Sequence, residues 1–405
     1  MNIFLTLTLA LVIILFLLRR HYAIGPAILC GGFFIWLLQA PNPHYLVTAA
    51  YQTATMPRTY DLLFALYFVM CLEIELRTSG TLEGMVSALR RLFTSEKFTL
   101  ALMPAFLGLL PSLGGARFSA PIVEAVSKDA PISAENKSAI NFWFRHVFEF
   151  SNPINPGMIM ACSIASIPIS SLIFQLGWLT PVAFALGWLI CLHPLALPSH
   201  PSTPSSTREK RKNLADIALS LSPVLINFLL VVFGGMGAAT SMGLVAVGMI
   251  LLLRCTARVV NIKDVFYGAL DLKMILNVTC ILYFIQLLTV TQVLATIVAA
   301  FQSSPLPIPI IIATVSFIIG MLTGLSQGHV AIVLPIVAAM APGDLTMVGI
   351  AMVFGIAGQM LTPTHVCLMV TLDYFKADFF RSLRPIVTTE LLLLIIFSLV
   401  TYCWY

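Results

Sequence analysis

The residues best suited to binding chemistry lie in two polar interruptions of a hydrophobic chain, and both interruptions occur twice. The first copy reads GLLPSLGGARFSAPIVEA from Gly108 to Ala125, followed by SNPINPGMIM from Ser151 to Met160. The second copy reads GMLTGLSQGHVAIVLPIVAA from Gly320 to Ala339, followed by LTPTHVCLMV from Leu361 to Val370. Glycine and proline interrupt helices, so each copy predicts backbone N–H and C=O groups without helical partners. Inside a membrane, such groups are stable only where protein or a water-filled cavity satisfies them.

The first interruption of each pair predicts the tip of a hairpin that could hold an anion. Free N–H groups at the start of the helical arm after each tip favour negative charge, as does the positive end of the helix dipole. Arg117 adds a guanidinium, which can bind a carboxylate or phosphate through two hydrogen bonds. His329 aligns with Arg117 in the second copy. The predicted anion-binding residues are Ser112, Gly114, Gly115, Arg117, Ser326, Gln327 and His329.

The second interruption of each pair predicts an unwound stretch inside a membrane-spanning helix. Pro153 and Pro156 each remove a helical hydrogen bond in the first copy, and Pro363 occupies the matching place in the second. Carbonyl groups freed there, together with side-chain oxygens, are suited to Na⁺. The side chains predicted to line the two stretches are Asn152, Asn155, Thr362 and Thr364. The alternative for any one Gly/Pro cluster is a kink where two helices pack closely.

Ionisable side chains near the interruptions are candidates for a coupling ion or proton, because charge inside a bilayer is costly and usually functional. Arg145 and Glu149 have the i,i+4 spacing of a pair on one helix face, and a structural ion pair is the alternative for them. His146 fits better with a neutral helix contact, whereas His365 could carry a proton. The predicted coupling residues are Glu124, Arg145, Glu149, Ser151 and His365.

Composition indicates a membrane protein without enzyme activity. Hydrophobic residues make up 59% of the 405-residue chain and charged residues 10%, against roughly 25% charged residues in soluble proteins. The eight cysteines form no C-x-x-C pair and no H-E-x-x-H occurs, so the sequence predicts neither a disulfide framework nor a metal site. No G-x-x-x-x-G-K-[ST] or G-x-S-x-G motif occurs, which argues against direct use of ATP and against a hydrolase. We expect no cofactor, apart from Na⁺ as a potential coupling ion.

The hydrophobic pattern predicts an all-α polytopic membrane protein built from two inverted-topology repeats. Each repeat is predicted to contain five transmembrane helices, one of them broken, and a re-entrant hairpin. The first repeat covers residues 1–192, with its hairpin at 98–126 and its broken helix at 137–163. A Pro/Ser-rich linker with a terminal basic run follows at 193–213.

The second predicted repeat covers residues 214–405, with its hairpin at 306–341 and its broken helix at 345–371. Segment 81–94 has an apolar face opposite charged residues and predicts a helix that lies on the membrane surface. The repeats begin on opposite sides of the membrane, so their broken regions are expected to meet near its midplane. The unbroken spans of both repeats are predicted at 2–18, 23–39, 60–77, 168–192, 214–234, 239–256, 271–289 and 385–403.

The basic residues orient this layout. All but three of the 22 lysines and arginines fall on one face, while Arg58 falls on the other and Arg117 and Arg145 fall within the membrane. By the positive-inside rule the face that carries most basic residues is cytoplasmic. We therefore expect a multi-pass protein of the inner membrane with a cytoplasmic linker and both termini on the external face. The net charge of +5 therefore comes from basic residues that orient the protein in the lipid bilayer, and no nucleic-acid partner is expected.

At LLPSLGGARFSAP, INFWFRHVFEFSNPINPG and GQMLTPTHVCLMVTLDYF the sequence resembles a prokaryotic integral-membrane family of unassigned function, domain-of-unknown-function family 401. The resemblance covers essentially the whole chain. That family is grouped with the ion transporter superfamily, alongside gluconate permeases and dicarboxylate/citrate carriers. The resemblance implies two inverted repeats and a homodimer that works by an elevator-type motion. Dicarboxylate carriers of that superfamily use Ser-Asn-Thr triplets near each hairpin tip, and the nearest match here is Ser151-Asn152-Pro153 in the broken span.

Together these features predict a secondary active transporter that moves a small organic anion, of carboxylate or sugar-acid type, by symport with H⁺ or Na⁺. One alternative is a cation/proton antiporter in which Glu124 and Glu149 carry the protons. An alternative from another class is a membrane-embedded lipid-processing enzyme with His146 and Glu149 as acid and base, for which the sequence offers no recognisable nucleophile.

Overall fold

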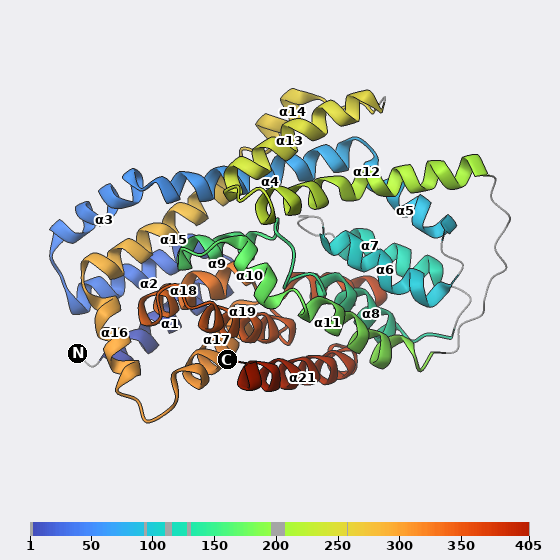
Figure 1. The fold of residues 1–405 in the computed structure, drawn as a ribbon. Coiled ribbons are helices and arrows are strands. Elements are labelled where there is room, and N and C mark those ends of the chain that lie inside the picture. The colour runs from blue at the N-terminus through green and yellow to red at the C-terminus, as the bar shows by residue number, and fades with distance from the viewer. Residues whose placement is uncertain are drawn as a thin grey trace.

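The computed structural model describes residues 3–92, 95–109, 116–127, 131–195, 207–256 and 258–404. These residues form 21 α-helices and one π-helix without any β-strand, so the predicted all-helical class is confirmed (Figure 1). Four of the described helical segments are long and apolar enough to cross a membrane: Thr207–Val232, Ala238–Cys255, Ile262–Val290 and Phe379–Cys403. A bent helix pair, Pro156–Ala165 with Ile169–Leu176, would be a fifth.

The first half of the chain contains twelve helical elements. They are α1 (Ile3–Arg19), α2 (Ile24–Gln39), α3 (Pro43–Thr55), α4 (Pro57–Thr78), α5 (Thr81–Leu92), α6 (Glu96–Leu109), α7 (Ala116–Val126), α8 (Ala134–His146), α9 (Pro156–Ala165), α10 (Ile169–Leu176), α11 (Leu179–Gly187) and the π-helix η1 (Trp188–Leu192).

The second half contains the remaining ten helices. They are α12 (Thr207–Val232), α13 (Ala238–Cys255), α14 (Ile262–Gly268), α15 (Leu272–Val290), α16 (Val293–Gln302), α17 (Ile308–Thr323), α18 (Ser326–Met340), α19 (Leu345–Met360), α20 (Val366–Phe375) and α21 (Phe379–Trp404).

Helices end and restart at the interruptions that the sequence analysis identified. α6 and α7 pack on each other, as do α17 and α18, and each pair forms a hairpin. Gly324 turns the chain between the arms of the second hairpin with a φ of 64°, a conformation that a side chain would disfavour. The chain leaves the helical path at 147–155, between α8 and α9, and again at 361–365, between α19 and α20. Figure 1 shows the second hairpin in the middle of the molecule and the first beside α8.

Glycines allow the first arm of each hairpin to approach the neighbouring broken helix closely. A Cβ atom on Gly108 in α6 would collide with the carbonyl oxygen of Arg145 in α8. A Cβ atom on Gly320 in α17 would collide with the carbonyl oxygen of Gly355 in α19. Small residues have this role in membrane proteins, where close van der Waals packing holds helices together. The same contact therefore recurs at aligned positions of the two halves.

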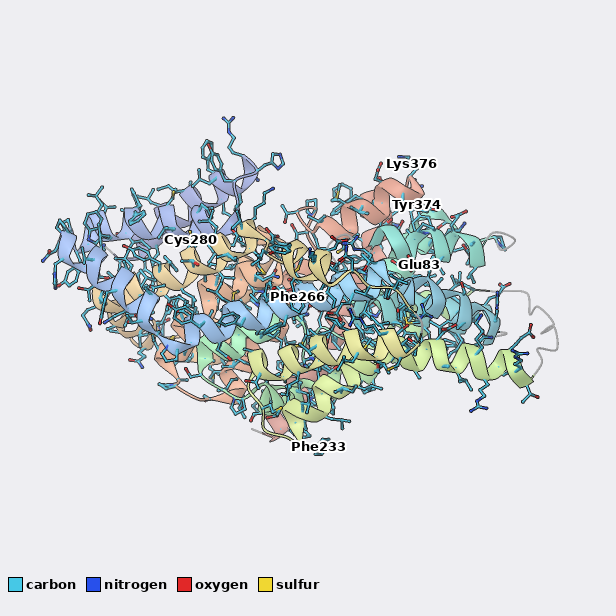
Figure 2. All side chains as sticks on the ribbon, turned by 90° about the horizontal axis from the view of Figure 1, so that it is seen from above. Glu83, Phe233, Phe266, Cys280, Tyr374 and Lys376 are labelled. Carbon is cyan, nitrogen blue, oxygen red and sulfur yellow. The ribbon has the colours of Figure 1, made fainter. Side chains whose placement is uncertain are left out.

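Helices of the two halves also pack on each other in a reciprocal pattern. α4 packs on α13 and α2 packs on α15, while α7 packs on α20 and α18 packs on α9. Seen from above, Tyr374 and Lys376 near the end of α20 lie at the edge opposite Phe233, which follows α12 (Figure 2).

The predicted span at 168–192 is interrupted in the structure. It contains α10, α11 and η1, with a turn at Gly177 and Trp178 between α10 and α11. The chain bends sharply just before this segment, between the predicted spans at 137–163 and 168–192, where α9 and α10 meet at an angle of 114°. Ser166 adopts a left-handed conformation with a φ of 55°, and Pro168 cannot donate a helical hydrogen bond.

The structure differs from the predicted layout in the linker, in α5 and in three short helices. The linker at 193–213 is shorter than predicted because α12 begins at Thr207, in a run of good helix formers. Helix α5 packs its apolar face on α12, with Met85 and Leu89 fully buried, so this face contacts protein and not lipid. Three helices were not predicted, namely α3, α14 and α16.

The glycine packing yields the first testable prediction. Gly320→Ala places a methyl group against the Gly355 carbonyl and should destabilise the protein by about 1–3 kcal/mol. Gly248→Ala is the matched control, since Gly248 also lies inside a helix but a Cβ atom there meets nothing within 4 Å. Thermal unfolding in detergent should show a lower melting temperature for Gly320→Ala and an equal or higher one for Gly248→Ala. Equal melting temperatures for both variants would contradict the close approach.

Candidate functional site

The tip of the second hairpin lies between the two helix breaks. Gly324 lies against Thr364 and the backbone nitrogen of His365 in the second break. Two residues later, the side chain of Ser326 lies against Gly157, at the start of α9 after the first break. The tip therefore contacts both halves of the chain at the point where their helices are interrupted.

A carboxylate joins this tip to the first break. Oε2 of Glu149 accepts hydrogen bonds from Nδ2 of Asn155 at 3.0 Å and from Oγ of Ser326 at 3.4 Å. The predicted i,i+4 helical spacing of Arg145 and Glu149 is wrong, because α8 ends at His146 and Glu149 lies in the turns that follow. Because Glu149 lies outside the helix, its carboxylate contacts Ser326 in the opposite half of the chain and does not lie along the face of α8.

Two asparagines organise the first break. Oδ1 of Asn155 accepts from the backbone N–H of Gly157 at 2.8 Å and so caps α9. Nδ2 of Asn152 donates to the carbonyl oxygen of Leu109, the last residue of α6, at 2.8 Å. Its Oδ1 accepts from the N–H of Ile154 at 3.2 Å. The side chains thus satisfy peptide groups that the interrupted helices leave free.

The second break has an equivalent arrangement built from threonines. The hydroxyl oxygens of Thr362 and Thr364 are 3.0 Å apart. The Thr364 hydroxyl also donates to the carbonyl oxygen of Met321 at 3.5 Å. Met321 lies in the first arm of the second hairpin, at the position that Leu109 occupies in the first arm of the first hairpin. Each break therefore bonds to the first arm of the hairpin in its own half.

Three predicted coupling residues lie in other surroundings. Nη1 of Arg145 donates to the carbonyl oxygen of Leu107 at 3.3 Å, which ties α8 to α6. The hydroxyls of Ser151 and Thr180 are 2.7 Å apart. Glu124 forms an ion pair with Lys137 at 3.1 Å, between α7 and α8.

Two histidines from distant parts of the chain meet between the breaks. Nε2 of His146, the last residue of α8, is 3.2 Å from Nε2 of His365, which precedes α20. Both side chains are buried, and with Cys367 they bring three ligand-type atoms within 4.8 Å of one another. This cluster was not predicted from the sequence. Each histidine lies next to one of the two interruptions, which is a weak signal, but their separation of 219 residues hid the contact.

His329 lies one turn into α18 and is fully buried against Gly355 of α19. Neither of its ring nitrogens has a hydrogen-bond partner within the described part of the chain. Gln327, in the first turn of α18, is half-buried.

A small cavity lies behind the first break. Its walls include His146 from α8, Phe150 from the break and Glu390 from α21. Glu390 is almost fully buried, and its Oε1 has no hydrogen-bond partner among the described residues.

The predicted tip residues of the first hairpin, Ser112, Gly114 and Gly115, lie outside the described residues, as does the side chain of Arg117. The backbone of Arg117 belongs to the first turn of α7, which packs on α20.

Two comparisons connect this architecture with known proteins. The family described as "Protein of unknown function (DUF401)" matches residues 3–403. The chain belongs to the DUF401 family. The resemblance identified from the sequence motifs is thereby confirmed.

The fold of this DUF401 member is similar to the crystal structure of the YdaH transporter from Alcanivorax borkumensis. The TM-score is 0.60 at 15% sequence identity, and the match covers 91% of this chain and 89% of the other. No curated protein sequence matches the chain. The similarity establishes a shared fold along nearly the whole length of both proteins.

The double role of Asn155 gives a second prediction. Asn155→Ala removes the α9 cap and a donor to Glu149, and should lower the free energy of unfolding by about 2–4 kcal/mol. Asn261→Ala is the matched control, because Asn261 caps α14 through the same type of bond, to the N–H of Lys263. Removing that cap should cost only about 1 kcal/mol. Chemical denaturation of both variants measures the difference, and equal losses would contradict a structural link from Asn155 to Glu149.

Proposed function

We propose that this chain is a secondary active transporter of the inner membrane that moves a small organic anion by symport with H⁺. The observation that carries the proposal is the Glu149 carboxylate, which is hydrogen-bonded both to the first helix break and to the tip of the second hairpin. A proton on this group would change the contact between two parts of the molecule that belong to opposite halves.

Several helix starts support an anionic solute. α9, α18 and α20 all begin at the two breaks or at the hairpin tip between them. The start of a helix presents free N–H groups and the positive end of its dipole, which favour carboxylate or phosphate groups. Arg117, at the start of α7, would add a guanidinium suited to a carboxylate. The fold shared with the YdaH transporter is consistent with this reading.

Glu149 can couple proton binding to movement through simple hydrogen-bond chemistry. An ionised carboxylate accepts charge-assisted hydrogen bonds from Asn155 and Ser326, which hold the hairpin tip against the break. Protonation removes the charge and weakens both bonds, so the tip can separate from α9. Solute binding and proton binding would then favour the same rearranged state, which is the requirement for coupling.

The reciprocal packing supports two inverted repeats, at 1–192 and 214–405, on either side of the linker. If α2 corresponds to α13 and α4 to α15, the contacts of α4 with α13 and of α2 with α15 are one contact repeated by a two-fold relation. The contacts of α7 with α20 and of α18 with α9 follow the same rule. Inverted repeats place the binding site at their interface near the midplane, where the breaks and the hairpin tip meet.

The remaining features of the proposal follow from the distribution of charge and from the superfamily resemblance. The linker would be cytoplasmic and both termini outside, as the positive-inside rule requires. The protein would act as a homodimer whose hairpin-containing parts move relative to a fixed scaffold.

The proposal is tested in proteoliposomes that contain a pH-sensitive dye. A thermal-shift screen of carboxylates and sugar acids first identifies stabilising solutes, since a ligand at about a hundredfold excess over its Kd adds ~2.7 kcal/mol. Uptake of such a solute should carry protons inward in the wild type. Glu149→Gln should lower this proton influx by roughly tenfold or more, equivalent to ~1.4 kcal/mol of lost stabilisation.

Glu73→Gln provides the control for Glu149→Gln, because Glu73 pairs with Arg77 near the end of α4, away from the breaks. It should transport and couple normally. Wild-type coupling in Glu149→Gln would contradict the proposed role.

A further prediction concerns Arg117. Arg117→Ala should reduce uptake of the identified anion by roughly tenfold or more, because the bidentate contact is lost. Arg254→Ala removes an exposed arginine at the end of α13 and should leave uptake unchanged. Uptake by filtration of labelled solute measures both, and unchanged transport by Arg117→Ala would exclude this arginine from the binding site.

A cation/proton antiporter is the second candidate, because the Glu149 carboxylate of the first break accepts a hydrogen bond from Ser326 at the hairpin tip, and a carboxylate can bind a cation as well as a proton. In that case Na⁺ added outside would dissipate an imposed pH gradient in the absence of any organic anion. A gradient that persists until an organic anion is added favours the symporter.

A further inference from the structure

Hydrogen bonding determines which ring nitrogens of His146 and His365 carry hydrogen. Nδ1 of His146 is 2.7 Å from the carbonyl oxygen of Phe142, and Nδ1 of His365 is 3.1 Å from that of Gln359. A carbonyl oxygen can only accept, so each Nδ1 must be the donor. In a neutral imidazole only one nitrogen carries hydrogen, so each Nε2 presents a lone pair.

These two lone pairs face each other in the interior of the protein. The Nε2 atoms are 3.2 Å apart, and no hydrogen is available from either neutral ring to bridge them. A metal cation fits this arrangement. Zn²⁺ binds imidazole nitrogen at about 2.0–2.1 Å with tetrahedral angles, which separates two such nitrogens by about 3.3–3.4 Å.

Cys367 supplies a third ligand of the right type. Its sulfur and one ring nitrogen from each histidine all lie within 4.8 Å of one another, and thiolate together with imidazole is a common ligand set for Zn²⁺. The bonds from Nδ1 to backbone carbonyls are also characteristic, because metal-binding histidines usually donate their other ring N–H to an oxygen acceptor.

We propose that His146, His365 and Cys367 form a binding site for one metal ion of the Zn²⁺ class. A thiolate at Cys367 would offset one of the two positive charges of the ion. Two other charged side chains lie near the site. Nη1 of Arg145 donates to the Leu107 carbonyl, and the Glu390 carboxyl lines the cavity beside His146. Water in the fourth position would complete the tetrahedron.

The site would connect the two breaks directly. His146 is the last residue of α8, and His365 immediately precedes α20. A bound ion would therefore hold the end of one interrupted helix to the start of the other, across the two halves of the chain.

Metal binding by the purified full-length protein tests this inference without any transport assay. Protein dialysed against chelator is titrated with Co²⁺, which reports tetrahedral sites through its d–d absorption and thiolate ligands through a near-ultraviolet charge-transfer band. The wild type should bind about one Co²⁺ per chain, show both features and release the ion to Zn²⁺. Absence of binding would overturn the proposal.

Two cysteine variants identify the thiolate. Cys367→Ser should abolish the charge-transfer band, whereas Cys403→Ser, which changes an exposed cysteine near the C-terminus, should retain it. Retention of the band in Cys367→Ser, or its loss in Cys403→Ser, would place the ion elsewhere and overturn the assignment.

A measurement on the Zn²⁺-loaded wild type needs no variant. X-ray absorption should show two imidazole nitrogens and one sulfur around the zinc. Any other set of protein ligands would contradict the site.

Discussion

The structure depends on one constraint: a peptide group that leaves a helix inside a membrane needs another hydrogen-bond partner. The breaks meet this constraint with asparagine and threonine side chains. Asn155 caps α9, Asn152 bonds to the end of α6, and Thr364 bonds to α17. Each of these bonds fixes a hairpin or a helix start relative to a break, so satisfying the backbone also positions the candidate site.

Close packing holds each half together, whereas polar contacts join the two halves. Gly108 and Gly320 bring each hairpin against the broken helix of its own half, with backbone touching backbone. Such contacts leave little freedom for movement within a half. The polar contacts of Glu149 with Ser326 and of His146 with His365 instead join opposite halves. Hydrogen bonds and metal ligands respond to protons, ions and solutes, so the junction between the halves is the part of the fold that chemistry can alter.

Much of the fold could be predicted because its signals are local. Long apolar runs mark spans, and glycine or proline marks their interruptions, so helices of the described residues end and restart close to the predicted interruptions. The differences arose where local signals were weak or misleading. Helix α3 has only 13 residues, too few to cross a membrane, although Asn42 and Pro43 give it a recognisable start. The interruption between α10 and α11 falls at Gly177, and a single glycine inside an apolar run marks the end of a helix only weakly.

The sequence by itself determined the membrane class, the family and the duplicated interruptions, because composition and the order of residues along one helix carry that information. It also identified Asn152, Asn155, Glu149 and Ser326 as candidates. Only the tertiary structure decided which of them meet. Glu149 bonds to Ser326 across 177 residues, and His146 lies beside His365 across 219. Such partners are set by how two halves pack on each other, and helical periodicity within either half contains no information on that packing.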